Sequence, residues 1–352
     1  MLARRLEAPA LAGWDPDALV GAVLLGPVSV PGTTLRKGMR LDRATATTLI
    51  AASRRGELTQ PVRAGWLEPG DLHEDEAAER LATVAAGQGL VCQPPRQSRL
   101  DLTARWAGVL HVQLNPLLRL NTVDSLELFT LFHGQAVAAG QVVASVKVAP
   151  HILPATLLEQ GLRIAAEDAP LVDVRPYQRH QVGALAVEAL SGTALERFEA
   201  GVRKKVDALG STFAGITVLP GLAAAEARRA LQTLALDRSI SILLVGGVSA
   251  GDPLSPFYTA LEELGGRVLR HGVPAHPGSM IWLAELGSTR LLGLPRCGMF
   301  AMATAADLIL PRLLTGERLT AGSLAELAHG GVLGPEMRFR FPPYARDLDV
   351  PE

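Results

Sequence analysis

The chain contains little cysteine. Only two of its 352 residues are cysteines, Cys92 and Cys297, and they lie far apart in the sequence. Two such residues make no disulfide framework, and no Cys and His spacing typical of a zinc site is present. This cysteine usage is typical of a reducing compartment, so we expect a cytoplasmic protein.

Aromatic residues and net charge are also scarce. Aromatic residues make up 4% of the chain, and the formal net charge is −1. Nucleic-acid surfaces need basic patches and stacking rings, so this composition argues against a nucleic-acid partner. No uninterrupted apolar segment is long enough to span a bilayer, and no apolar run follows Met1–Arg5 as in a signal peptide. We therefore expect no membrane association.

Apolar residues are abundant, at 48% of the chain. With this length they predict two or three globular domains. Residues 1–95 are expected to form a mixed α/β segment with helices over 43–54 and 74–86. Residues 96–178 alternate short apolar stretches, such as 142–148, with turn signals, which predicts a small β-rich unit and a linker.

From residue 179 to about residue 315 the pattern becomes strand, helix, strand. Strands are predicted over 182–190, 216–219 and 240–245, with helices over 195–209 and 223–234. This alternation predicts an α/β fold: a mostly parallel sheet with helices on both faces, in three α/β/α layers. Residues 316–352 are expected to form a C-terminal tail. Ligands of such folds gather beyond the carboxyl ends of the strands.

Three loops of this α/β segment are rich in glycine or proline. They run from Gly246 to Asp252, from His276 to Ser279 and from Gly293 to Gly298. The first and third directly follow apolar strands. Glycine lets a ligand approach the backbone, whose N–H groups suit phosphate. The loops therefore predict an enclosed site for a phosphate-bearing ligand, with ordinary tight turns as the alternative.

The order of these loops resembles the molybdopterin-binding domain of molybdopterin molybdotransferases, molybdopterin adenylyltransferases and the gephyrin E domain. The resemblance extends over residues 179–315 and rests on GGVSAGD at 246–252, ELGG at 263–266, PG at 277–278 and GLP at 293–295. It implies a site for molybdopterin or adenylylated molybdopterin, with Mg²⁺ and molybdate as further reactants.

The resemblance also implies which residues bind the ligand. The main cradle would be Gly246, Gly247, Val248, Ser249, Ala250, Gly251 and Asp252. The opposing walls would be Pro277, Gly278, Ser279, Gly293, Leu294, Pro295 and Arg296. Ser191 and Gly192 occupy the small-residue turn that follows the first strand of such domains.

Some positions depart from the molybdotransferase pattern. Leu254 stands where these enzymes have a functional aspartate, and no lysine follows Pro277–Gly278. The acidic pair after the first strand is replaced, which leaves Glu196 as the nearest carboxylate there. Asp252 and Glu196 are therefore the candidate catalytic carboxylates. Backbone N–H groups supply much of the binding, so these departures affect catalysis more than binding.

Two functions follow from this comparison. The chain is either a molybdotransferase-like enzyme of molybdenum cofactor biosynthesis or a non-catalytic carrier that delivers the cofactor to a recipient molybdoenzyme. A third alternative is a fold relative that binds another nucleotide-like ligand. Members of the resembled family assemble into oligomers, so we also expect a homo-oligomer.

Three further features have competing interpretations. Arg296 is either a phosphate ligand or a solvated loop residue. Cys297 is more simply a small buried apolar residue than a reactive thiol. Asp71, His73, Glu74 and Asp75 resemble a metal cluster, but their place before a helix favours carboxylates that interact with the helix dipole.

Overall fold

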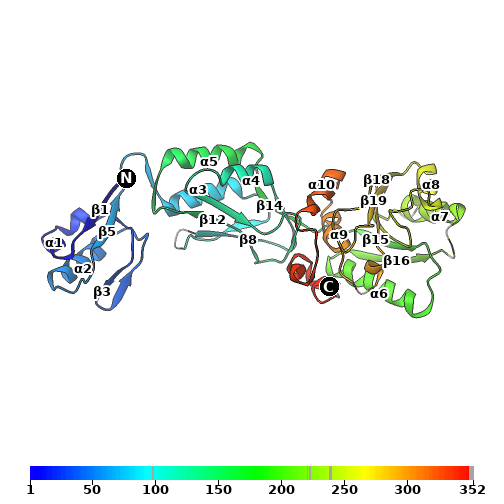
Figure 1. Cartoon of the computed structure of the whole chain (residues 1–352), viewed down its shortest axis with the longest axis horizontal. Coiled ribbons are helices and arrows are strands. Elements are labelled where there is room, and N and C mark those ends of the chain that lie inside the picture. Colours follow the sequence, from blue (N-terminus) through cyan, green and yellow to red (C-terminus); the bar gives the residue numbers. More distant parts are fainter. Residues whose placement is uncertain (97–98, 220, 222, 238–239, 301, 349–352) are drawn as a thin grey trace. The chain divides into compact units, whose positions relative to one another are not determined.

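The computed structural model describes residues 1–96, 99–219, 221, 223–237, 240–300 and 302–348. The other positions, among them 349–352 of the expected tail, lie outside the described residues. The chain divides into two compact units (Figure 1). The first unit comprises Met1–Trp106, His111–His133 and Ala139–Val174. The second comprises Ala107–Leu110, Gly134–Ala138 and the residues from Arg175 onward.

The N-terminal part of the first unit combines a small antiparallel sheet, in the order β1-β5-β2, with short helices and a β3–β4 hairpin. Its elements are β1 (Leu2–Leu6), α1 (Ala8–Leu11), η1 (Pro16–Leu19), β2 (Val23–Leu24), β3 (Val28–Val30), β4 (Thr33–Leu35), α2 (Arg43–Arg54) and β5 (Val62–Trp66). Helix α2 confirms the helix predicted over 43–54. The Asp42 carboxylate accepts a hydrogen bond from the Thr45 N–H at 2.8 Å and caps its first turn.

The rest of the first unit contains an antiparallel sheet in the order β10-β12-β8-β7 and the contacting helices α3 and α5. The bounds are β6 (Asp71–His73), α3 (Glu74–Ala85), β7 (Leu90–Cys92), β8 (Arg99–Ala104), β9 (Gly108–Val112), α4 (Leu114–Leu120), β10 (Leu126–Thr130), β11 (Ala136–Val137), β12 (Val142–Val148), β13 (Ile152–Pro154), α5 (Ala155–Glu167) and β14 (Val172–Pro176). Helix α3 ends one residue before the predicted end, and β12 matches its prediction. Strands β9 and β11 pair antiparallel through Val109 with Ala136 and Gly108 with Val137, which are residues of the second unit.

The second unit contains a six-stranded sheet in the order β16-β15-β17-β20-β19-β18. The first four strands are parallel, and β19 and β18 are antiparallel to their neighbours. The bounds are β15 (Gln181–Ala186), α6 (Gly192–Ala208), β16 (Thr212–Val218), α7 (Ala224–Leu231), η2 (Gln232–Asp237), β17 (Ile242–Gly246), α8 (Pro256–Glu263), β18 (Arg267–His271), β19 (Trp282–Leu286) and β20 (Thr289–Gly293). A mixed α/β fold with a parallel centre is therefore observed, as the strand and helix alternation predicts.

Both faces of the sheet are buried at its central strand β17. Along β17, Ile242 and Leu244 belong to one apolar cluster, whereas Leu243 and Val245 belong to another. Because successive side chains of a strand point to opposite faces, the two clusters lie on opposite sides of the sheet. Helix α6 contributes to the first cluster, and helices α7 and α8 contribute to the second. This double burial explains why β17 is apolar at every position.

The residues after the sheet form several short helices. They form η3 (Cys297–Met299), α9 (Ala306–Leu314), α10 (Ala321–Ala325), η4 (Glu326–Ala328), η5 (Pro335–Arg340) and α11 (Pro343–Arg346). Leu324, Phe341 and Ala345 are fully buried in the same cluster as α6. The helices of this stretch are short and prolines are frequent, so its sequence shows no long run of helical periodicity.

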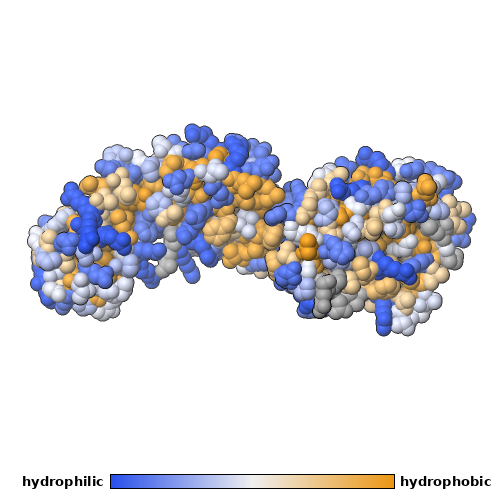
Figure 2. All heavy atoms as spheres, viewed as in Figure 1, coloured by the Kyte–Doolittle hydropathy of each residue, from blue (hydrophilic) through white to orange (hydrophobic). Residues whose placement is uncertain are grey.

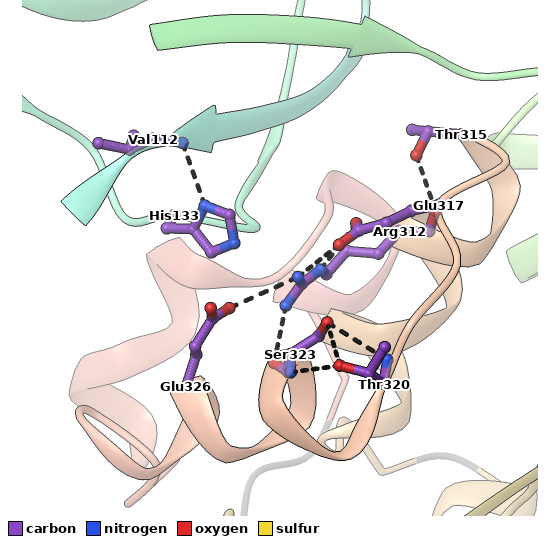
Figure 3. A network of polar contacts seen from close by, with 8 residues as sticks. All are labelled: Val112, His133, Arg312, Thr315, Glu317, Thr320, Ser323 and Glu326. Atoms are coloured by element: carbon purple, nitrogen blue, oxygen red, sulfur yellow. Dashed lines mark hydrogen bonds and ion pairs between the residues drawn. The ribbon is translucent and has the colours of Figure 1, made fainter. Parts of the chain in front are cut away.

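A buried arginine ties α9 to the elements that follow it (Figure 3). The Arg312 guanidinium donates to both carboxylate oxygens of Glu317 at 2.9 and 2.6 Å and to the Ser323 carbonyl at 3.2 Å. Glu326 lies 3.6 Å from the same group. A buried charge requires such partners, so the network fixes the start of the C-terminal region. In the first unit, Figure 3 shows the Val112 N–H donating to His133.

Within the described residues, no helix is long and apolar enough to cross a membrane. Figure 2 shows hydrophilic residues spread over the visible face of both units, with apolar residues among them. Large apolar side chains that are exposed include Leu254, at 87%, and Met280, at 54%.

Candidate functional site

Three loops that are distant in the sequence line one pocket of the second unit. The pocket has a volume of about 410 Å³, within the range of small-molecule sites. It is lined by Glu188, Gly247, Val248, Ser249, His276, Pro277, Gly278, Ser279, Met280, Leu294, Pro295, Arg296 and Cys297. All three glycine- or proline-rich loops contribute, so the predicted convergence of these loops is observed.

The sheet brings the first and third loops together. Strands β17 and β20 are parallel neighbours, so the loops that follow them leave the same edge of the sheet. The Leu294 N–H donates to the Val245 carbonyl at 2.7 Å and joins the two exits. The second loop is held separately, because the Ala305 N–H donates to the Pro277 carbonyl at 2.9 Å. The site therefore lies beyond the carboxyl ends of parallel strands, where ligands of this fold class bind.

The first loop needs glycine at its turn. Gly247 has φ +85°, and a Cβ there would lie 3.1 Å from the Val187 carbonyl carbon and 3.3 Å from the Glu188 Cγ. A larger residue would thus be strained in its backbone and crowded by its neighbour. The turn consequently packs directly against the segment that follows β15.

Hydrogen bonds fix the carbonyl groups of this loop. The buried Trp282 indole donates to the Val248 carbonyl at 3.0 Å, and the Tyr258 hydroxyl donates to the Ser249 carbonyl at 3.1 Å. Burial, helped by the charge of Asp252, raises the pKa of Tyr258, so its hydroxyl stays protonated as a donor. Both side chains come from elements of the sheet region, β19 and α8, and orient the loop from outside the pocket.

Three successive amide groups of the first loop have no acceptor among the described residues. Within the described part of the chain, the backbone N–H groups of Gly247, Val248 and Ser249 donate no hydrogen bond to the protein. Successive unpaired N–H groups in a glycine turn are the usual receptor for an anionic oxygen. The loop can therefore accept a phosphate without rearranging its own hydrogen bonds.

Two opposite charges line the pocket. Arg296 is exposed and Glu188 is partly buried, and neither forms an ion pair with any described residue. Cys297 also lines the pocket and is partly exposed, so it is not the buried residue that the sequence favours. The pocket thus offers one cation, one carboxylate and one thiol in mainly apolar walls.

Several residues that we expected at the site do not line this pocket. They are Ser191, Gly192, Glu196, Gly246, Ala250, Gly251, Asp252 and Gly293. A Cβ at Gly246 would lie 2.5 Å from Met299, and one at Gly293 would lie 2.1 Å from Trp282, so both glycines serve close packing. Asp252 caps its own turn, because its carboxylate accepts from the Leu254 N–H at 3.1 Å.

Four lining residues are not among the predicted ligand-binding residues: Glu188, His276, Met280 and Cys297. Glu188 follows strand β15, which ends at Ala186 and not at the predicted Leu190. Ligands of such folds bind beyond the strand ends, so a strand predicted to end at Ala186 would identify Glu188 as a site residue. His276 directly precedes Pro277, and its backbone pairs with Gly331 and Leu333.

The acidic group before α3 has structural partners. Asp71 pairs with the Met1 amino group at 2.7 Å, which holds the pKa of this carboxyl below its usual value. The His73 ring accepts from the Asp75 N–H at 3.2 Å, and the buried Glu74 lies 2.7 Å from the His151 ring. Among the described residues no group of three or more His, Cys, Asp or Glu has the arrangement of a metal site.

The second unit is thus an α/β fold with a glycine-loop pocket at the carboxyl edge of its parallel strands. Similar solved structures include a MoaB molybdopterin biosynthesis enzyme from Thermus thermophilus, with 18% identity over 39% of this chain and 98% of that chain (TM-score 0.28). A molybdopterin biosynthesis MoeA protein from Pyrococcus horikosii is 13% identical over 72% of this chain and 80% of that chain (TM-score 0.29).

A deletion mutant of NadC is 13% identical over 47% of this chain and 68% of that chain (TM-score 0.16). No protein-family model and no curated protein matches the chain. Likenesses of this size define neither the family nor the activity of the protein.

Proposed function

We propose that the pocket of the second unit binds molybdopterin or its nucleotide derivative in molybdenum cofactor biosynthesis. The convergence of the three loops on one pocket supports this most directly. Their order along the chain resembles that of molybdopterin-binding domains, and the free N–H groups of Gly247, Val248 and Ser249 suit the phosphate of such a ligand. Arg296 lines the same pocket, and its guanidinium would pair with this phosphate.

The proposal includes the architecture and setting of the protein. The residues from 179 to 315 would form a three-layer α/β/α molybdopterin-binding domain. Residues 1–95 and 96–178 would be accessory domains. We further propose a cytoplasmic homo-oligomer that meets a recipient molybdoenzyme.

Titration of the full chain with molybdopterin in equilibrium dialysis tests this function. We expect saturable binding at micromolar concentration with one ligand per chain. Oxidation of the freshly purified protein should also release a fluorescent pterin derivative if the ligand is retained. Absence of both results would reject the proposal.

A carrier function is the second candidate, and the exposed position of Leu254 favours it. Leucine offers neither a proton nor a metal ligand, and Glu188 is the carboxylate that lines the pocket. A single-turnover reaction with adenylylated molybdopterin, molybdate and Mg²⁺ separates the two functions. Release of AMP supports a molybdotransferase-like enzyme, whereas binding without release supports a carrier.

A further inference from the structure

Glu188 places a carboxylate in a pocket whose first loop suits an anion. The residue lies just beyond β15, is partly buried and lines the pocket together with Gly247 and Arg296. Like charges repel, so a phosphate bound to the free N–H groups would avoid this carboxylate. The Glu188 Cγ lies 3.3 Å from the position that a Cβ at Gly247 would take, so the side chain borders the cradle at Gly247. A bound phosphate would therefore lie toward Val248 and Ser249, away from this carboxylate.

The Glu188 carboxylate has no partner among the described residues. Among the described residues, no donor or cation hydrogen-bonds to the Glu188 side chain, and Arg296 does not neutralise it. A partly buried carboxylate loses some of its hydration and only accepts hydrogen bonds. A ligand that donates N–H hydrogen bonds to this carboxylate would replace the hydration that burial removes.

The backbone around Glu188 is held in place. The Val187 N–H donates to the Gly246 carbonyl at 2.9 Å, and the Leu190 N–H donates to the Glu188 carbonyl at 2.7 Å. The turn at Gly247 packs against the same segment. A carboxylate on a fixed segment selects ligands by shape as well as charge, because little ordering is needed on binding.

We propose that Glu188 determines ligand specificity by accepting two hydrogen bonds from the 2-amino-4-oxopyrimidine edge of a heterocycle, while the cradle and Arg296 hold its phosphate. This edge presents a ring N–H beside an exocyclic NH₂ group, which matches the two oxygens of a carboxylate. Pterins carry it, and so does guanine. The inference rests on the proposed function for the choice of the pterin.

The test compares ligands that differ only at this edge. Calorimetric titration of the full chain uses 6-hydroxymethylpterin phosphate and its 2-oxo lumazine analogue, then GMP and IMP. A charge-assisted hydrogen bond corresponds to a roughly 10- to 100-fold difference in affinity. We expect the wild-type protein to prefer the pterin over the lumazine by about this factor.

Two variants test whether Glu188 causes the preference for the pterin over the lumazine. Glu188→Gln should reduce the discrimination to within about threefold, because the amide keeps only one acceptor. Glu262→Gln is the matched control, since Glu262 is an exposed carboxylate of α8 that does not line the pocket. It should keep the wild-type preference. Thermal unfolding of both variants checks that the fold is retained.

The outcomes separate the inference from the proposed function. Equal affinity of the wild-type protein for pterin and lumazine, or full discrimination in Glu188→Gln, would overturn the inference alone. Preference for GMP over IMP without pterin binding would show that Glu188 recognises the 2-amino-4-oxopyrimidine edge. It would overturn the proposal that the pocket binds a pterin. Failure of all four ligands to bind would overturn both.

Discussion

The Lys205 ammonium and the Asp307 carboxylate form a buried ion pair that joins α6 to α9. The second Asp307 oxygen accepts from the Thr304 N–H at 2.9 Å. The next residue, Ala305, donates to the Pro277 carbonyl in the second pocket loop. The pair therefore supports both the core of the second unit and one wall of the pocket.

Removal of one partner should unfold this region. Asp307→Asn or Lys205→Met leaves a buried charge uncompensated, which costs about 3–5 kcal/mol in the free energy of unfolding. Urea denaturation measures the change. Glu263→Gln is the control, because its ion pair with Arg228 at 3.9 Å is exposed and worth about 1 kcal/mol or less. Equal effects of the buried and exposed changes would contradict this account of the pair.

Gly247 should matter for binding as well as stability. Gly247→Ala introduces a Cβ 3.1 Å from the Val187 carbonyl carbon in a backbone with φ +85°, so the loop must move. We expect weaker molybdopterin binding together with a stability loss of about 1 kcal/mol or more.

Gly265→Ala provides a matched control for this change. Gly265 has φ +81° at the end of α8, and its added Cβ would meet no atom within 4 Å. It should lose a similar stability and keep the wild-type affinity. If both variants bind alike in dialysis, the first loop is not the cradle.

Arg296 should act on the phosphate and not on the ring. Arg296→Gln is expected to weaken binding of a phosphorylated pterin by about tenfold or more, because a charge-assisted hydrogen bond is lost. Affinity for the same pterin without phosphate should hardly change. Arg318→Gln, an exposed arginine outside the pocket, controls for net charge. Equal losses for both ligands would show that Arg296 does not contact the phosphate.

Structure follows from sequence most directly where local chemistry decides it. The Asp42 cap and the apolar period of residues 43–54 define α2 regardless of what it packs against. The pocket loops could be located for a similar reason, since glycine turns after apolar strands lie at one sheet edge. The roles of individual loop residues depend on tertiary neighbours, as at Gly246 and Gly293, whose Cβ positions are taken by Met299 and Trp282.

Dependence on tertiary neighbours also explains why the sequence does not reveal Glu188 as a pocket residue. The apolar run over 182–190 suggests one long strand, but β15 ends at Ala186, where Val187 pairs with Gly246 and the chain turns. That end is set by the neighbouring strand and not by any residue of the run itself. A charged residue in such a run is therefore a sign of a strand end, which a search for periodicity overlooks.

Glu285 should make the second unit sensitive to acid. On β19 it faces Arg267 of β18 and Arg290 of β20, and these guanidinium groups hold the pKa of its carboxyl below the usual 4.5. A lowered pKa stabilises the fold above the unfolded-state value, and this contribution disappears as the pH falls through the folded-state value.

The wild-type protein should accordingly exceed Glu285→Gln in stability at pH 6 and lose this advantage below about pH 4.5. The carboxylate is partly exposed, so the advantage should be about 1 kcal/mol or less. Urea midpoints between pH 6 and pH 3 measure it. If the stability difference between the wild-type protein and Glu285→Gln increased toward low pH, it would contradict this role of the two ion pairs.

Hydrogen exchange at the first pocket loop tests the central claim most directly. The N–H groups of Gly247, Val248 and Ser249 have no acceptor in the described protein and should exchange rapidly without ligand. If they bind the phosphate of molybdopterin, saturating ligand should slow exchange in peptides that contain residues 247–249. Saturable binding with unchanged exchange at these residues would place the ligand elsewhere and contradict the account.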